Sequence, residues 1–137
     1  MRILSLDVGD RRIGMAVSDA LGWTAQGLDT LERKNDRADM EHIKKVFEYY
    51  GADRIVVGLP KNMNGTLGPQ GEKVMKFGEF LKTNLNAEIV FWDERLSTVS
   101  AHKTMIEGDV SRQKRKKHVD RLAAVFILQS YLDYINR

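Results

Sequence analysis

Acidic residues stand at the boundaries of the predicted elements, where residues that do chemistry commonly gather. Asp7 comes at the end of an apolar run, and Asp93 and Glu94 directly follow another one. Asp120 stands at the beginning of a long apolar helical pattern. A carboxylate at such a position needs a hydrogen bond, a counter-charge or a metal, because burying a bare charge is costly. Since carboxylate oxygens suit hard divalent cations, these acids predict a Mg²⁺ or Mn²⁺ site.

Each acid also has a structural interpretation that the residues alone leave open. Asp7 suits a turn in which its carboxylate binds its own backbone. Asp93 and Glu94 suit the N-terminus of the helix that follows, where the helix dipole favours acids. Adjacent strand residues point to opposite faces, so only one of this pair is expected to face Asp7. Asp120, taken alone, is a helix-start acid.

Other reaction chemistries find little support in the sequence. The chain has no cysteine, which excludes disulfides, thiolate zinc sites and a cysteine nucleophile. Its three histidines form no zinc-binding motif. His118 is a candidate for proton transfer or phosphate contact, although a histidine at a helix entry is common. Ser97 suits a helix cap, and the glycine-rich nucleotide-binding motifs are absent.

A focal basic segment indicates an anionic partner. The chain has 137 residues and a net charge of +3, but residues 111–117 hold five basic residues and no acid. Outside this segment acids slightly outnumber bases, so the positive excess is local. Such a patch favours nucleic acid as the partner, with a solvated loop as the alternative.

The composition is typical of one globular domain over residues 1–137. Hydrophobic residues make up 42% of the chain and charged residues 30%, which excludes a disordered protein. No apolar run approaches the ~20 residues of a membrane span, and Asp7 comes too early for a signal peptide. We therefore expect a cytoplasmic protein without a membrane partner.

The hydrophobic patterns predict an α/β fold that gathers the acids at one edge of a sheet. Strands are predicted over residues 2–8, 13–18, 24–31, 54–58 and 88–92. Helices are predicted over residues 36–50, from Pro69 onward, over 97–108 and over 119–135, with the basic segment as a loop. The first three strands are expected to be antiparallel and the later ones to follow helical crossovers. The result is a mixed five-stranded sheet with helices on both faces, whose sites lie beyond the carboxyl ends of its strands.

Four sequence blocks, in order along nearly the whole chain, resemble the YqgF/RuvX-type nuclease family. They are residues 3–19 (ILSLDVGDRRIGMAVSD), 57–60 (VGLP) with Asn64-Gly65, 93–98 (DERLST) and 120–124 (DRLAA). The resemblance implies a ribonuclease H-like fold, which agrees with the predicted order of elements. It also implies an endonuclease that processes the 5′ end of pre-16S ribosomal RNA in ribosome biogenesis, or one that resolves Holliday junctions in DNA.

The resemblance assigns roles to individual residues. It implies an acidic triad of Asp7, Glu94 and Asp120, and so selects Glu94 over Asp93. It implies hydrolysis of phosphodiester bonds with the help of Mg²⁺ (or Mn²⁺), two ions about 4 Å apart being able to activate water and stabilise the leaving oxygen. The residues that it implies for binding the phosphate backbone are Arg11, Arg95, Lys116 and Lys117. The loop over residues 62–68 is interpreted as a flap that closes on a strand.

Three alternatives remain open at this level. A Holliday junction resolvase makes paired cuts and favours a homodimer, whereas the sequence does not decide between monomer and homodimer. An actin-like ATP-binding protein also opens with an Asp-x-Gly hairpin, but it uses two such lobes and this chain has the length of one. A non-catalytic RNA-binding module would bind without regard to Mg²⁺ or to Glu94.

Overall fold

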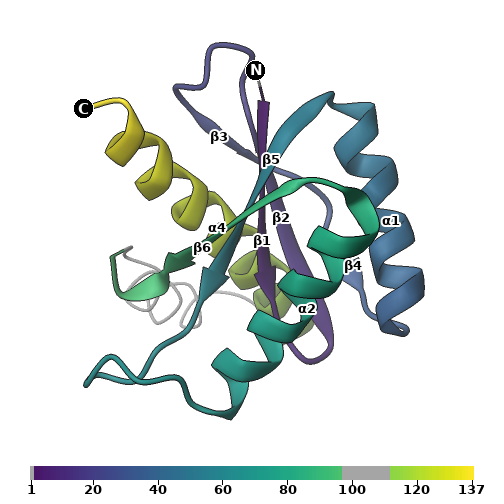
Figure 1. Ribbon diagram of the computed structural model, residues 1–137, viewed down its shortest axis with the longest axis vertical. Helices are drawn as coiled ribbons and strands as arrows, with labels where there is room; N and C mark the ends of the chain where they lie inside the picture. Colours follow the sequence, from purple (N-terminus) through teal and green to yellow (C-terminus); the bar gives the residue numbers. More distant parts are fainter. Residues whose placement is uncertain (1, 97–111) are drawn as a thin grey trace.

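A single mixed sheet organises the part of the chain that the structure describes. The structure is a computed structural model that describes residues 2–96 and 112–137, with side chains described for 2–96 and 121–137. Within these ranges the strands are β1 (Arg2–Val8), β2 (Arg12–Ser18), β3 (Ala25–Gly27), β4 (Leu31–Glu32), β5 (Ala52–Leu59) and β6 (Glu88–Asp93). Their order is β3-β2-β1-β5-β6, and β4 also pairs with β2 (Figure 1).

Strand direction follows from the connections. β1 and β2 form an antiparallel hairpin in which Leu4 pairs with Val17 and Asp7 pairs with Gly14. β5 and β6 instead run parallel to β1, with Leu6 beside Val57. Parallel neighbours need a crossover, which helices α1 (Asp36–Tyr49) and α2 (Pro69–Leu85) supply. The carboxyl ends of β1, β5 and β6 therefore meet at one edge of the sheet.

The helices begin and end at residues with recognisable capping chemistry. α1 covers Asp36–Tyr49, and the side chain of Asn35 accepts a hydrogen bond from the Ala38 backbone N–H. α2 covers Pro69–Leu85, starting on a proline that needs no N–H partner there. A 3₁₀ turn, η1 (Glu94–Leu96), follows β6, and α4 covers Arg112–Ile135.

Alternation along β1 divides the core between the two faces of the sheet. Leu4 and Leu6 are fully buried in the cluster that packs against α1 and α2. Ile3 belongs to the opposite cluster, with Ala124 and other residues of α4. α1 and α2 thus cover one face and α4 covers the other (Figure 1). Asp7, an even number of residues from Ile3, faces α4.

The predicted fold class is confirmed, and two of its details are wrong. The third strand, predicted over residues 24–31, is two short strands, so the described sheet has six strands rather than five. Between them the Leu28 N–H donates to the Met15 carbonyl at 2.9 Å, and the Leu28 carbonyl accepts from Arg121 Nε at 3.2 Å. Leu28 still lies in the register of β3, whereas Leu31 pairs with Ile13, one residue out of that register, so the strand is interrupted between them.

The basic segment is the second correction. Residues 112–117, predicted as a loop, form the first turns of α4. Lysine and arginine are good helix formers, so a run of them extends the apolar helix that follows. The helix predicted over residues 97–108 lies outside the described residues. No helix among those described is long and apolar enough to cross a membrane.

Candidate active site

Asp7 is a nearly buried acid at the carboxyl end of β1. Its exposure is 9%, and it shares the α4-facing side of the strand with Ser5, which is fully buried. The Ser5 hydroxyl donates a hydrogen bond of 2.8 Å to the Ala124 carbonyl of α4. On the neighbouring strand, Val57 lies beside Leu6, so Gly58 follows at the level of Asp7.

The Glu94 carboxylate lies over Gly58 on the same face of the sheet. A Cβ atom added to Gly58 would lie 2.9 Å from Glu94 Oε1 and 2.4 Å from Ile127 Cδ1 of α4. The carboxylate therefore occupies part of the space that a side chain at position 58 would take. Because adjacent strands are about 4.8 Å apart, the fold brings Asp7 and Glu94 together at one edge of the sheet.

The direction of α4 places the helix position of Asp120 at this same edge. Tyr131 of α4 contacts Arg54 at the amino end of β5, whereas Ile127 packs at Gly58 near its carboxyl end. α4 therefore runs antiparallel to β5. Asp120 stands one helical turn before Ala124, toward the carboxyl ends of the strands. Its side chain lies outside the described residues, among which no group of three metal-ligating side chains occurs.

Asp93 takes a different position from Glu94, although the two are neighbours in sequence. Its carboxylate forms a close ion pair with Arg95, with Nε 3.1 Å from Oδ1 and Nη2 2.7 Å from Oδ2. The hydrogen bonds from Arg95 hold the pKa of Asp93 below its ordinary value, and the Asp93 carboxylate raises the pKa of Arg95. Asp93 is thus engaged with Arg95, while Glu94 lies over the sheet edge.

Arg95 also fastens the loop between β5 and α2. Its Nη1 lies 3.3 Å from the Met63 carbonyl oxygen and 3.5 Å from that of Asn62. The loop has its own hydrogen bonds, from the Asn62 N–H to the Thr66 carbonyl and from the Gly65 N–H to the Asn62 carbonyl, both 2.9 Å. The segment interpreted as a flap is therefore, in this structure, a folded loop that presents a fully exposed Met63 beside β6.

The other predicted phosphate contacts come from two places. Arg11 is exposed in the turn between β1 and β2, at the edge that holds Asp7. Lys116 and Lys117 stand in the first half of α4, and their side chains, like that of His118, lie outside the described residues.

Gly58 is a site residue whose role sequence reasoning missed. It belongs to one of the four family blocks, but the blocks give no reason for its being glycine. A glycine that ends a β-branched run signals a close approach of another group, and here that group is the Glu94 carboxylate together with Ile127.

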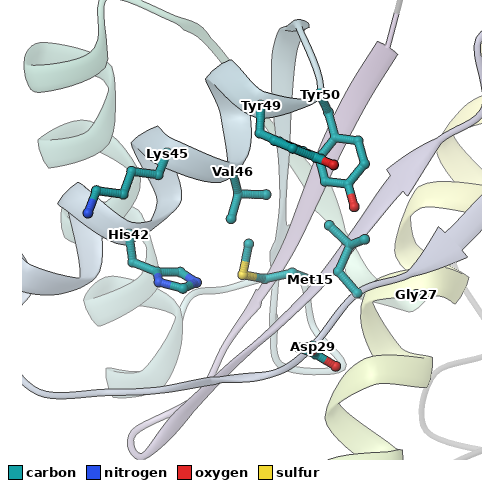
Figure 2. Close-up of a pocket in the computed structure, with 9 residues that line it drawn as sticks. Met15, Gly27, Asp29, His42, Lys45, Val46, Tyr49 and Tyr50 are labelled. Carbon is teal, nitrogen blue, oxygen red and sulfur yellow. The ribbon is translucent and has the colours of Figure 1, made fainter.

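A hollow lies elsewhere, on the α1 face of the molecule. It is a groove of about 580 Å³ between α1 and the β3 edge, with Met15 and Val46 at its floor and His42 and Lys45 on its wall. Figure 2 shows these side chains with Tyr49 and Tyr50 at one end. None of the predicted site residues lines this groove, which is therefore separate from the candidate active site.

The space above Gly58 gives a test of the packing. We expect Gly58→Ala to lower the free energy of unfolding by about 1–3 kcal/mol, because its methyl group would overlap Ile127 Cδ1. Ile127→Val removes that atom, so the double variant should be more stable than the sum of the single changes predicts. Chemical denaturation of the four proteins measures this coupling. Strict additivity would contradict the close contact.

The Asp93–Arg95 pair predicts a pH dependence of stability. Because the pKa of Asp93 is lowered on folding, its contribution is complete above the ordinary value of 3.8 and is lost as the pH falls through the folded-state pKa. Denaturation from about pH 6 to pH 2 should show a smaller loss of stability in Asp93→Asn than in the unmodified protein. Arg95→Gln should flatten the curve similarly. An unchanged pH profile in both variants would contradict the pairing.

Comparison with known proteins finds relatives that match this chain over nearly their full length. A family model described as "RuvX: Holliday junction resolvase" matches residues 1–134. A Clostridium tetani protein named "Putative pre-16S rRNA nuclease" is 62% identical over 135 residues, covering 98% of each chain. A Clostridium botulinum protein of the same name is 59% identical over 137 residues, covering all of both chains.

Solved structures share the fold at low sequence identity. Thermus thermophilus RuvC in complex with a Holliday junction superposes with a TM-score of 0.63 at 10% identity, covering 99% of this chain and 95% of that one. Fowlpox virus resolvase, also bound to Holliday junction DNA, gives a TM-score of 0.58 at 15% identity over the whole of both chains. The mixed sheet with helices on both faces is thus the fold of RuvC-like, ribonuclease H-like resolvases. By the family model and its relatives at about 60% identity, the chain belongs to the RuvX family of nucleases and Holliday junction resolvases.

Proposed function

We propose that this chain is a single-domain, Mg²⁺- or Mn²⁺-dependent endonuclease that hydrolyses phosphodiester bonds in the 5′ region of pre-16S ribosomal RNA. Asp7, Glu94 and Asp120 form its catalytic and metal-binding triad. The observation that carries the proposal is the meeting of Asp7 and Glu94 at one sheet edge, with Gly58 leaving room for the Glu94 carboxylate. The names of its relatives at about 60% identity supply the substrate.

The donor set suits a hard divalent cation. Carboxylates from two separate elements meet at the edge of the sheet, and the helix position of a third lies on the same side. Their hard oxygen atoms match Mg²⁺ or Mn²⁺, and the chain has no cysteine for softer metals. Asp7, Glu94 and Asp120 would hold the ion. When bound, such an ion supplies Lewis-acid stabilisation of the negative charge that develops during hydrolysis of a phosphate ester.

Basic residues position the nucleic acid. Arg11 lies in the turn just beyond Asp7, and Lys116 and Lys117 stand in α4 before Asp120. Arg95, whose side chain is 42% exposed beside its ion pair with Asp93, is the fourth proposed contact. Contacts to phosphate hold a strand in register and do not read its sequence. Selection of a cleavage site would therefore depend on the shape of the substrate.

A Holliday junction resolvase is the second candidate, because the family model carries that description and two similar folds were solved on such junctions. Paired cleavage of a four-way junction requires two active sites, so this function expects a homodimer. Incubation with precursor ribosomal RNA and with a four-way DNA junction, each with and without Mg²⁺, separates the two candidates. Measurement of the mass in solution gives an independent answer.

Asp7→Asn tests the acidic triad. We expect it to abolish cleavage while leaving the melting temperature and nucleic-acid affinity close to those of the unmodified protein, because the amide keeps the shape but loses the charge. Asp53→Asn, at an exposed position at the amino end of β5, is the matched control and should cleave normally. Cleavage by purified Asp7→Asn at the unmodified rate would overturn the triad.

Neutralising the basic helix start tests substrate binding. Lys116→Gln together with Lys117→Gln should weaken binding to all sequences alike and reduce the salt slope by roughly 0.7–0.9 for each phosphate that is no longer neutralised. Lys44→Gln with Lys45→Gln, an exposed adjacent pair on α1, is the control. Titration of labelled RNA at several salt concentrations measures both effects. Equal slopes for the two double variants would contradict a special role for residues 116 and 117.

A further inference from the structure

The turn that follows Asp7 is held by side chains from distant parts of the chain. We propose that Arg33, fixed by the buried Asp39, is a positioning residue that holds this turn and thereby sets the place of the Asp7 carboxylate. Gln70 supports the same turn from α2. The inference rests on the proposed function, because it takes Asp7 as a catalytic acid.

Arg33 is held on several sides in a largely buried position. Its side chain is 18% exposed, and its Nη1 donates to the Gly9 carbonyl oxygen at 3.0 Å. Its Nε lies 3.0 Å from Asp39 Oδ2 and its Nη2 lies 2.9 Å from Asp36 Oδ1. The guanidinium group also lies over the Phe77 ring, 4.8 Å from the centroid. These contacts restrict the directions in which the guanidinium could swing.

Asp39 holds the Arg33 side chain in this position. Its side chain is 1% exposed, and its second oxygen, Oδ1, accepts a hydrogen bond of 3.0 Å from the Lys34 backbone N–H. Burying a carboxylate without such partners is costly, and Asp39 and Arg33 therefore hold each other in place. Since Asp39 belongs to α1, the pair ties the start of that helix to the turn after β1.

The end of β1 keeps its pairing with β2, in which Val8 pairs with Ile13, but loses its pairing with β5. Pairing of β1 with β5 reaches Leu6, one residue before Asp7. Beyond it, the Val8 carbonyl accepts from Gln70 Nε2 at 3.3 Å, and the Gly9 carbonyl accepts from Arg33. Gln70 stands in the first turn of α2. Two side chains thus bind the carbonyl groups at the end of β1 and in the turn that follows it.

The consequence concerns the geometry of catalysis more than folding. Both supported carbonyls lie within two residues of Asp7, so a shift of the turn would move its carboxylate relative to Glu94. A displacement of about 1 Å in a catalytic group can reduce turnover roughly 100-fold, even when substrate still binds. Loss of the clamp formed by Arg33 and Asp39 should therefore lower kcat and change KM little, because Arg95, Lys116 and Lys117, three of the four proposed phosphate contacts, lie outside this turn.

Arg33→Lys is the informative variant. Lysine keeps a positive charge for Asp39, but its single ammonium group cannot reproduce the planar, forked set of contacts to Asp39, Asp36 and Gly9. Arg54→Lys is the matched control. Arg54 is also partly buried and pairs with Glu88 and the Tyr131 hydroxyl, but at the amino end of β5, far along the sheet from Asp7.

Two readouts separate positioning from stability. We expect Arg33→Lys to lower kcat about 10-fold to 100-fold with KM little changed, whereas Arg54→Lys should keep the kcat of the unmodified protein. Hydrogen exchange measured by NMR provides a readout that needs no substrate. The Gly9 N–H, which donates to the Arg12 carbonyl at 2.8 Å, should exchange faster in Arg33→Lys and not in Arg54→Lys.

The outcomes are distinguishable. If Asp7→Asn is inactive and Arg33→Lys keeps its kcat, the positioning role is overturned and the proposed function stands. If Asp7→Asn cleaves at the unmodified rate, the proposed function fails, and with it the catalytic meaning of the clamp. If Arg33→Lys does not fold, Asp39→Asn decides, because it keeps an oxygen for the Lys34 N–H and removes the charge that pairs with Arg33. A lower kcat at unchanged KM supports the clamp, and an unchanged kcat overturns it.

Discussion

The structure depends on placing a carboxylate in an almost buried position of an apolar strand. Asp7 is 9% exposed, and the residues before it in β1 belong to the core. A charge in such a place is costly unless the surroundings compensate it. Three features surround this position: β1 ends just after Asp7, the neighbouring strand carries glycine at position 58, and Arg33 and Gln70 bind the carbonyl groups of the two residues after Asp7.

The two faces of the sheet serve different purposes. The α1 and α2 face is filled by large side chains such as Ile43, Phe77 and Leu81, which give a wide apolar core. On the α4 face, small residues meet at the sheet, among them Ser5, Ala16 and Ala124. Small side chains let a helix approach a sheet closely. The face that carries Asp7 is thus also the one on which the helix bearing residue 120 comes nearest.

The sequence predicted strands correctly where the local residue pattern and the tertiary environment agree. The strand predicted over residues 2–8 matches β1, because a strand buried on both faces leaves a continuous apolar run. The weakly alternating stretch over residues 24–31 was less well predicted. The interruption of this strand lies where Arg121, more than ninety residues further along the chain, donates hydrogen bonds to the Leu28 carbonyl and the Asp29 carboxylate. Such long-range contacts leave no local trace.

The candidate site, like the fold, was predictable only in part. The strand-end positions of the acids follow from pattern alone, but the choice between Asp93 and Glu94 required the family resemblance. The roles of Gly58, Arg33 and Asp39 could not be derived, since each depends on which distant group meets it in the folded chain.

The sequence Asp93-Glu94-Arg95 shows why neighbouring charges need not share a task. Arg95 follows both acids directly, and its guanidinium pairs with the Asp93 carboxylate. The Arg95 backbone N–H donates to Asp93 Oδ1 at 2.9 Å, and its guanidinium returns to the same carboxylate. This local closure needs the 3₁₀ turn that begins at Glu94. The turn therefore confines Arg95 to Asp93 and the loop, and leaves Glu94 directed over the sheet edge toward Gly58.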